Sequence, residues 1–135
     1  MAENVSGTFD ITSQDRPYDE AEGARLMHAT GHKVFRGGIE GTSRVELIKA
    51  VSAVPGSAAY VGLERVVGAV GGRAGSFVLR HTGLMDRGDA TLEVTVVPDT
   101  GTGDLTGIAG RMTITVVDGH HDYTFEYSLP SSSPE

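Results

Sequence analysis

Arg111-Met-Thr-Ile-Thr-Val-Val-Asp-Gly-His-His-Asp-Tyr-Thr-Phe-Glu-Tyr-Ser-Leu129 is the stretch that decides the fold class. Its Asp118-Gly119 pair is a strong signal of a two-residue β-hairpin turn. Folding the chain about this turn puts apolar residues on one face and polar residues on the other. A one-residue slip would send every side chain to the opposite face, so the agreement fixes the register. The apolar face pairs Gly110 with Tyr127, Met112 with Phe125 and Ile114 with Tyr123.

The same pattern of strand and turn continues along the whole chain. Nineteen glycines recur between short runs rich in Val, Ile, Thr, Tyr and Phe, which is typical of consecutive strands. Helical spacing is weak, and the best helical candidate, Tyr18–Met27, is short, charged and interrupted by Gly23. The eight expected strands are Val5–Thr12, Leu26–Gly37, Thr42–Ala53, Ala58–Val70, Ala74–Thr82, Ala90–Val97, Ile108–Val117 and Asp122–Leu129.

Three further turns extend the predicted interior. The turn Val70-Gly-Gly-Arg73 predicts a hairpin whose two faces are both partly apolar, as in a closed barrel whose outside also meets a partner. A turn at Asp86-Arg87-Gly88 pairs the expected strand Ala90–Val97 with the preceding strand, Ala74–Thr82. The turn at Pro55-Gly56 is open to a one-residue shift by a glycine bulge. The predicted pairs are Val66–Phe77, Glu64–Leu79, Gly62–His81, Leu79–Val94, Phe77–Val96 and Lys49–Gly62; the apolar outer face comprises Val61, Leu63, Val67 and Val78.

Eight mostly amphipathic strands with one long connection, Pro98–Gly107, favour an all-β fold, an eight-stranded antiparallel up-and-down barrel. A lipocalin-like sandwich is the alternative. Residues 1–130 are expected to form a single domain, and residues 131–135 a disordered tail.

The composition narrows the class of protein. The net charge of −7 and the pI near 5.1 argue against a nucleic-acid or membrane partner, since either favours a basic patch. No apolar run approaches the length of a membrane helix, about 20 residues. The start of the chain lacks the features of a secretory signal. With no cysteine there is no disulfide and no thiolate nucleophile. We therefore expect a cytoplasmic protein.

Several segments carry a resemblance to known barrels. The stretch Gly101–Ile114 resembles the glycine-rich signature of allene oxide cyclase-like and dirigent-like barrels. The segments Ser6–Phe9, Ile39–Ser43, Val61–Val66 and Gly71–His81 more closely resemble a bacterial family of small barrels in that superfamily, known only as a domain of unknown function.

The resemblance implies an eight-stranded barrel, often self-associated, with an apolar cavity open at one end. In this superfamily, allene oxide cyclase closes a ring in an unstable fatty-acid epoxide, and dirigent proteins steer the coupling of radicals or quinone methides. The cysteine of the cyclase pocket has no counterpart in this chain.

Glu64 and His81 are the candidate catalytic residues. On the predicted register Glu64 shares an apolar face with Tyr60, and His81 is its diagonal neighbour across the hairpin. A carboxylate and an imidazole in a cavity can act as general base and acid. The alternative is a buried ion pair that fixes strand register. The candidate ligand-binding residues are Tyr60, Phe77, Glu40, Phe125 and Tyr127.

Other polar motifs are weaker candidates. Glu40 lies in a glycine-rich strand bend, where it would either point into the barrel mouth or accept hydrogen bonds from the backbone. His28 and His32 would chelate a metal on a helix, but on a strand they lie roughly 13 Å apart. His120-His121-Asp122 has its neighbours on opposite faces. The sequence thus predicts no metal site, and it carries no motif for a cofactor.

Two functions fit these features. The first is binding of a small apolar ligand in the barrel cavity, as a carrier or as an isomerase or cyclase. The second is a non-enzymatic homo-oligomeric module with a packed barrel, whose outer apolar face is the interface. Cavity volume separates the two, because a ligand site needs at least a few hundred Å³.

Overall fold

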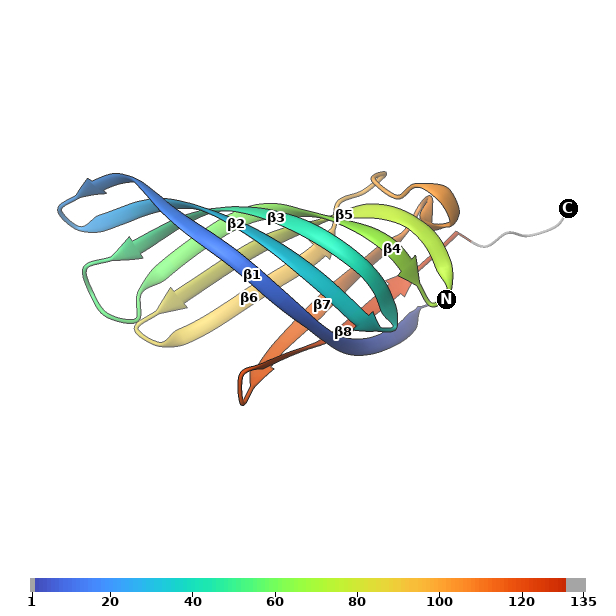
Figure 1. The fold of residues 1–135 in the computed structure, drawn as a ribbon. Helices are drawn as coiled ribbons and strands as arrows, with labels where there is room; N and C mark the ends of the chain where they lie inside the picture. Colours follow the sequence, from blue (N-terminus) through green and yellow to red (C-terminus); the bar gives the residue numbers. More distant parts are fainter. Residues whose placement is uncertain (1, 131–135) are drawn as a thin grey trace, which may run out of the picture.

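Eight antiparallel strands follow one another in chain order around a closed barrel (Figure 1). The computed structural model describes residues 2–130, so the tail expected at residues 131–135 lies outside the described residues. The predicted up-and-down barrel is confirmed, and closure of the sheet excludes the sandwich. The elements are β1 (Glu3–Ala21), β2 (Ala24–Gly37), β3 (Ile39–Ser52), β4 (Ala58–Val70), β5 (Arg73–Asp86), β6 (Asp89–Val96), the short 3₁₀ helix η1 (Gly103–Leu105), β7 (Ala109–Val117) and β8 (His120–Ser128).

Two hairpin registers agree with the sequence prediction. In the β7–β8 hairpin, Met112 pairs with Phe125 and Ile114 with Tyr123. In the β4–β5 hairpin, Glu64 pairs with Leu79. Both turns are tight and glycine-containing, so the turn itself defines the register.

Two other registers are wrong by two residues. Lys49 pairs with Tyr60 rather than Gly62, because residues 53–57 form a connection longer than a two-residue turn. Leu79 pairs with Val96 rather than Val94, because the β5–β6 turn consists of Arg87 and Gly88 alone. A shift of two residues leaves every side chain on its predicted face, since the period of a strand is two.

The segment Tyr18–Met27, the best but weak helical candidate of the sequence analysis, is not helical. This segment forms the end of β1 and the start of β2, where Ala21 pairs with Ala24 across the turn. Gly23 takes a φ of 95° there, which favours glycine. The segment is mostly polar, so its strand conformation depends on pairing with β2 rather than on an apolar face of its own.

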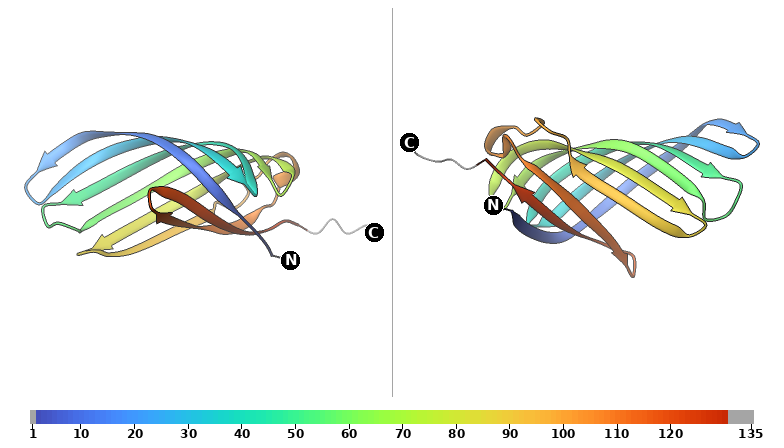
Figure 2. Two further views of the ribbon diagram at one scale, coloured as in Figure 1. Left: turned by 60° about the horizontal axis from the view of Figure 1, so that its bottom comes forward. Right: turned by 180° about the vertical axis from the view of Figure 1, so that it is seen from behind.

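The barrel has a closed half and an open half. Strand β8 pairs with β1 only up to Phe9, and β6 pairs with β7 only at Val94 and Thr95. Beyond these points the wall consists of strands β1–β6 alone, whose hairpins extend past the diverging β7–β8 hairpin (Figures 1 and 2). One end of the interior is therefore flanked by an incomplete wall.

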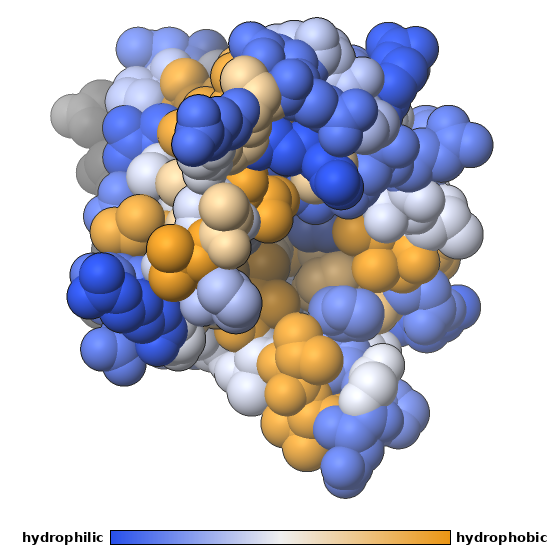
Figure 3. Space-filling view, turned by 90° about the vertical axis from the view of Figure 1, so that its left-hand side faces the viewer, coloured by the Kyte–Doolittle hydropathy of each residue, from blue (hydrophilic) through white to orange (hydrophobic). Residues whose placement is uncertain are grey.

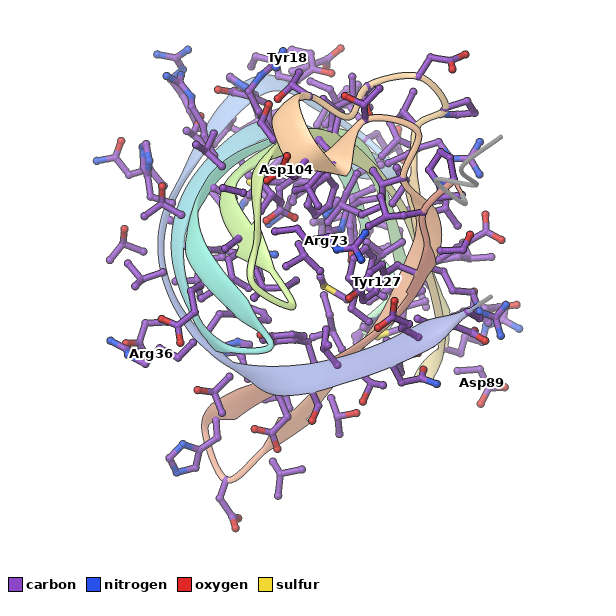
Figure 4. All side chains as sticks on the ribbon, turned by 90° about the vertical axis from the view of Figure 1, so that its right-hand side faces the viewer. Tyr18, Arg36, Arg73, Asp89, Asp104 and Tyr127 are labelled. Atoms are coloured by element: carbon purple, nitrogen blue, oxygen red, sulfur yellow. The ribbon has the colours of Figure 1, made fainter. Side chains whose placement is uncertain are left out.

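The closed half contains the packed core. Phe77 stacks on Phe125 with ring centroids 5.6 Å apart, and Phe125 stacks on Tyr127 at 5.4 Å. The long connection between β6 and β7 closes this end, because Leu105 and Ile108 are buried in the same cluster. Figure 4 looks onto this end, with Tyr127 inside the ring of strands and Arg36 and Asp89 pointing outward.

Tyr123 joins β8 to the tight β2–β3 corner. Its hydroxyl oxygen accepts a hydrogen bond from the Ile39 amide at 2.7 Å and donates to the Arg36 carbonyl at 2.8 Å. Burial raises the pKa of Tyr123, so it remains a phenol at neutral pH.

Removal of this hydroxyl should destabilise the barrel. We expect Tyr123→Phe to lower the free energy of unfolding by about 1–3 kcal/mol, since the buried Ile39 amide loses its partner. Tyr18→Phe, at an exposed tyrosine, is the matched control and should be nearly neutral. Urea titration of the three proteins measures the difference. Equal midpoints for Tyr123→Phe and wild type would contradict this role.

Candidate functional site

The interior of the open half is a hollow that reaches solvent. Along β6 the inward-facing residues change from buried Val94, 1% exposed, to Leu92, 43% exposed; along β5 they change from buried His81 to Met85, 40% exposed. Figure 3 views this end of the molecule and shows a central depression with hydrophobic residues around it. On β4 and β5 the change from partly exposed to buried inward-facing side chains falls at the level of Glu64 and His81, which form the floor of the hollow, whereas on β2 the inward-facing Met27 is already buried farther out.

Glu64 is a completely buried carboxylate with three side-chain partners. Its Oε1 accepts hydrogen bonds from Lys33 Nζ at 3.2 Å and from His81 Nε2 at 2.6 Å. Its Oε2 accepts a hydrogen bond from Ser43 Oγ at 2.5 Å. All four side chains are buried, and they come from the consecutive strands β2, β3, β4 and β5. We call Lys33, Ser43, Glu64 and His81 the floor cluster.

These partners keep Glu64 ionised. Burial by itself raises the pKa of its carboxyl, but the hydrogen bond from His81, the charges of Lys33 and His81 and the hydrogen bond from Ser43 outweigh burial. The pKa falls from 4.5 to about 2. A carboxylate held so firmly as an acceptor is a poor general base, so its role is to compensate Lys33 and orient His81.

The ionised carboxylate fixes the proton on His81. Because Glu64 can only accept, the Nε2 atom of His81 must carry the hydrogen of the 2.6 Å bond. In the neutral ring the Nδ1 atom then holds a free lone pair. In residues 2–130 Nδ1 has no protein partner, yet no fully buried side-chain nitrogen or oxygen there is unpaired. The Nδ1 atom is therefore not completely enclosed, although His81 as a whole is only 4% exposed.

Lys33 and Ser43 are members of the site that the sequence analysis missed. The signal was present in strand parity, because Lys33 lies two residues before Phe35 and so must face the interior with it. Ser43 likewise shares its face with Val45. The ammonium of Lys33 also lies 4.5 Å from the ring centroid of Phe9, within cation–π distance.

The other predicted site residues divide among three places. Tyr60 is half-buried on the wall of the hollow, and burial raises the pKa of its phenol. Phe77, Phe125 and Tyr127 belong to the packed core of the closed half rather than to the wall. Glu40 is exposed on β3, next to buried Ile39, and does not join the floor cluster.

The structure offers no grouped metal ligands in the part of the chain that it describes. Residues 2–130 bring together no set of three or more His, Cys, Asp or Glu side chains that could hold an ion. His28 and His32 lie on strand β2, and His28 instead bonds Glu46 at 2.6 Å. Over the same residues, no helix is long and apolar enough to cross a membrane.

Comparison with known proteins defines the family. The model of the family described as "Protein of unknown function (DUF3224)" matches residues 5–127. The chain belongs to the DUF3224 family. The structure is similar to the crystal structure of a DUF3224 protein of unknown function from Shewanella oneidensis MR-1. The TM-score is 0.87 and the sequence identity is 38%. The match covers 97% of this chain and 100% of the Shewanella chain. A search of curated proteins found no match. For this DUF3224 protein, the wider relation to allene oxide cyclase-like barrels stays a prediction of its sequence.

The floor cluster should make the free energy of unfolding of this DUF3224 protein fall as the pH is lowered. A carboxyl whose pKa is about 2 in the folded chain, against 4.5 ordinarily, contributes stability above pH 4.5 that is lost as pH falls toward 2. The shift corresponds to about 3 kcal/mol.

The measurement is urea unfolding between pH 6 and 2, wherever the protein remains folded. The control is the double variant Lys33→Met, Glu64→Gln, which removes both buried charges while every other carboxylate still titrates. Its stability should fall less steeply with acid than that of the wild type. Parallel curves for the two proteins would show that folding does not favour the ionised form of Glu64.

Proposed function

We propose that this DUF3224 protein binds a small, mostly apolar molecule in the open half of its barrel, with an oxygen function of the ligand at the floor cluster. The observation that carries the proposal is that the buried polar cluster lies at the inner end of a solvent-connected hollow. Had the cluster served only to hold strands together, any level of the barrel interior would have sufficed.

The chemistry of the hollow supports such a ligand. Its wall carries Met27, Ala29 and Leu47, which offer an apolar surface. Polar groups are few: the half-buried phenol of Tyr60, the Nδ1 atom of His81, and the Asp15–Lys49 ion pair of 2.8 Å, whose Lys49 pairs with Tyr60 across β3 and β4. Small-molecule sites have this composition of apolar walls with a few fixed polar groups.

His81 is the residue that gives the hollow reactive potential. The sequence analysis placed Glu64 and His81 together as base and acid; the geometry supports His81 as the group that meets the ligand and Glu64 as its positioning residue. A histidine oriented by a buried carboxylate is suited to proton transfer. An isomerase or cyclase fits this arrangement, as the resemblance to allene oxide cyclase-like barrels also implies.

A thermal-melt experiment tests ligand binding. The wild type, His81→Gln and the control His32→Gln, at an exposed histidine of the outer face, are melted with and without fatty acids, phenols and lactones. We expect at least one compound to raise the melting temperature of the wild type and of His32→Gln, but less that of His81→Gln. The glutamine amide keeps a donor for Glu64, so the fold should survive. If no compound shifts the wild type, the ligand site is refuted.

A separate observation supports a second candidate function, self-association. The outer face of β4 exposes Val61, Leu63 and Val67, each more than half exposed, and Val61 and Leu63 line a groove of about 430 Å³. Leu63 lies between Glu46 on β3 and Arg80 on β5. A two-fold axis parallel to β4 would set Glu46 of each copy opposite Arg80 of the other. We propose a second copy of the chain as the occupant of this face.

Analytical ultracentrifugation tests this interface. The wild type should sediment as a dimer at high micromolar concentration, whereas Val61→Glu should be monomeric because a charge would be buried at the interface. Val116→Glu is the matched control, since this valine is equally exposed but lies on β7. A monomeric wild type, or loss of the dimer in both variants, would count against the β4 face.

A further inference from the structure

Tyr60 and His81 lie next to each other on the wall and floor of the hollow. Tyr60 pairs with Gly83 and His81 with Gly62, so the two side chains are diagonal neighbours on the inward face of the β4–β5 hairpin. Their Cα atoms are therefore separated by about 7–8 Å. The phenol ring covers Gly83: a Cβ added there would lie 2.6 Å from Tyr60 Cζ, the atom that bears the hydroxyl.

The two groups differ in hydrogen-bonding character. Tyr60 remains a phenol at neutral pH because burial raises its pKa, and its hydroxyl has no protein partner within residues 2–130. It is thus free to donate. His81 offers the lone pair of Nδ1, because its other nitrogen donates to Glu64. The two diagonal neighbours thus supply a donor and a base on the inward face of one hairpin.

We propose that this pair transfers protons at a carbon next to a carbonyl group, on apolar enolisable ketones. The inference rests on the ligand site proposed above and names its substrate class. The carbonyl oxygen accepts the hydrogen bond of Tyr60, and the adjacent C–H bond faces His81 Nδ1.

The reaction is balanced without an added reactant. His81 Nδ1 takes the proton from the α carbon, the C–H electron pair becomes the new C=C bond, and the carbonyl π pair moves onto oxygen. The enolate oxygen is held by the Tyr60 hydroxyl, whose hydrogen bond strengthens as charge develops. Protonated His81 then returns a proton to the same carbon or to a conjugated one, which gives exchange or isomerisation. Glu64 stabilises the imidazolium in between.

The surroundings favour this chemistry over simple hydrolysis. The residues that flank His81 are buried, with Leu79 and Val94 at 0% and 1% exposure, whereas Tyr60 is half-buried. Water beside the imidazole is therefore limited, which strengthens its hydrogen bonds. Lys33 is held by Glu64 at 3.2 Å, so its ammonium serves the carboxylate rather than a substrate carbonyl.

Deuterium exchange into 2-tetralone, an apolar enolisable ketone, tests the proposal. Binding is measured by saturation-transfer NMR, and exchange at the carbon between the ring and the carbonyl is followed by proton NMR in D₂O. The variants are His81→Gln and Tyr60→Phe; the matched controls are His32→Gln and Tyr18→Phe, at exposed residues. Circular dichroism melts verify that each variant is folded.

We expect the wild type and both controls to accelerate exchange above the buffer rate. His81→Gln should lose on the order of 10²-fold of this rate, and Tyr60→Phe about tenfold or more, with 2-tetralone still bound. Binding without accelerated exchange would overturn the reaction while leaving the ligand site intact. Absence of 2-tetralone binding would also overturn the substrate class, and the melts with other compounds then decide the ligand site separately. Equal exchange by wild type and His81→Gln would remove His81 as the base.

Discussion

The buried charge of Glu64 is the constraint on which the rest of the interior depends. An isolated carboxylate at a site with no exposed surface would cost several kcal/mol, so each oxygen must meet a donor. Lys33, Ser43 and His81 supply these donors from three other strands. A slip of any one strand by a single residue would turn its donor to the outer face and leave the carboxylate short of a partner. The floor cluster therefore links four consecutive strands in one register.

The unequal lengths of the strands turn this structural cluster into the floor of a pocket. Because β7 and β8 pair with their barrel neighbours only near the closed end, the aromatic core and the β6–β7 connection fill that half, while the other half keeps an incomplete wall. Had all eight strands been equally long and filled by side chains, the cluster would lie in the middle of a packed barrel. Its place at the boundary gives a fixed polar group a route to solvent.

The two ring nitrogens of His81 have different roles: one stabilises the fold and the other is left for a ligand. The Nε2 atom of His81 is used by Glu64, and its Nδ1 atom remains for a ligand. The Lys33 ammonium is used twice, by the carboxylate and by the ring of Phe9, and both contacts keep it in place. Membership of the DUF3224 family and the shared barrel do not themselves identify a reaction, since one fold hosts many functions. The local geometry of His81 and Glu64, rather than the fold, is what suggests a function.

Alternation of apolar and polar residues, with tight glycine turns, was sufficient to predict from sequence the barrel, the β7–β8 and β4–β5 registers and the contact of Glu64 with His81. These features depend on neighbours in the chain, where a period of two fixes the face. Lys33 and Ser43 reach Glu64 from β2 and β3, so their contacts depend on the pairing of β3 with β4. The connection between these two strands, residues 53–57, is longer than the two-residue turn expected from the sequence. The strand conformation of residues 18–27 likewise depends on β2. The open half was decided by the tertiary structure alone, because it follows from where β7 and β8 diverge from the wall.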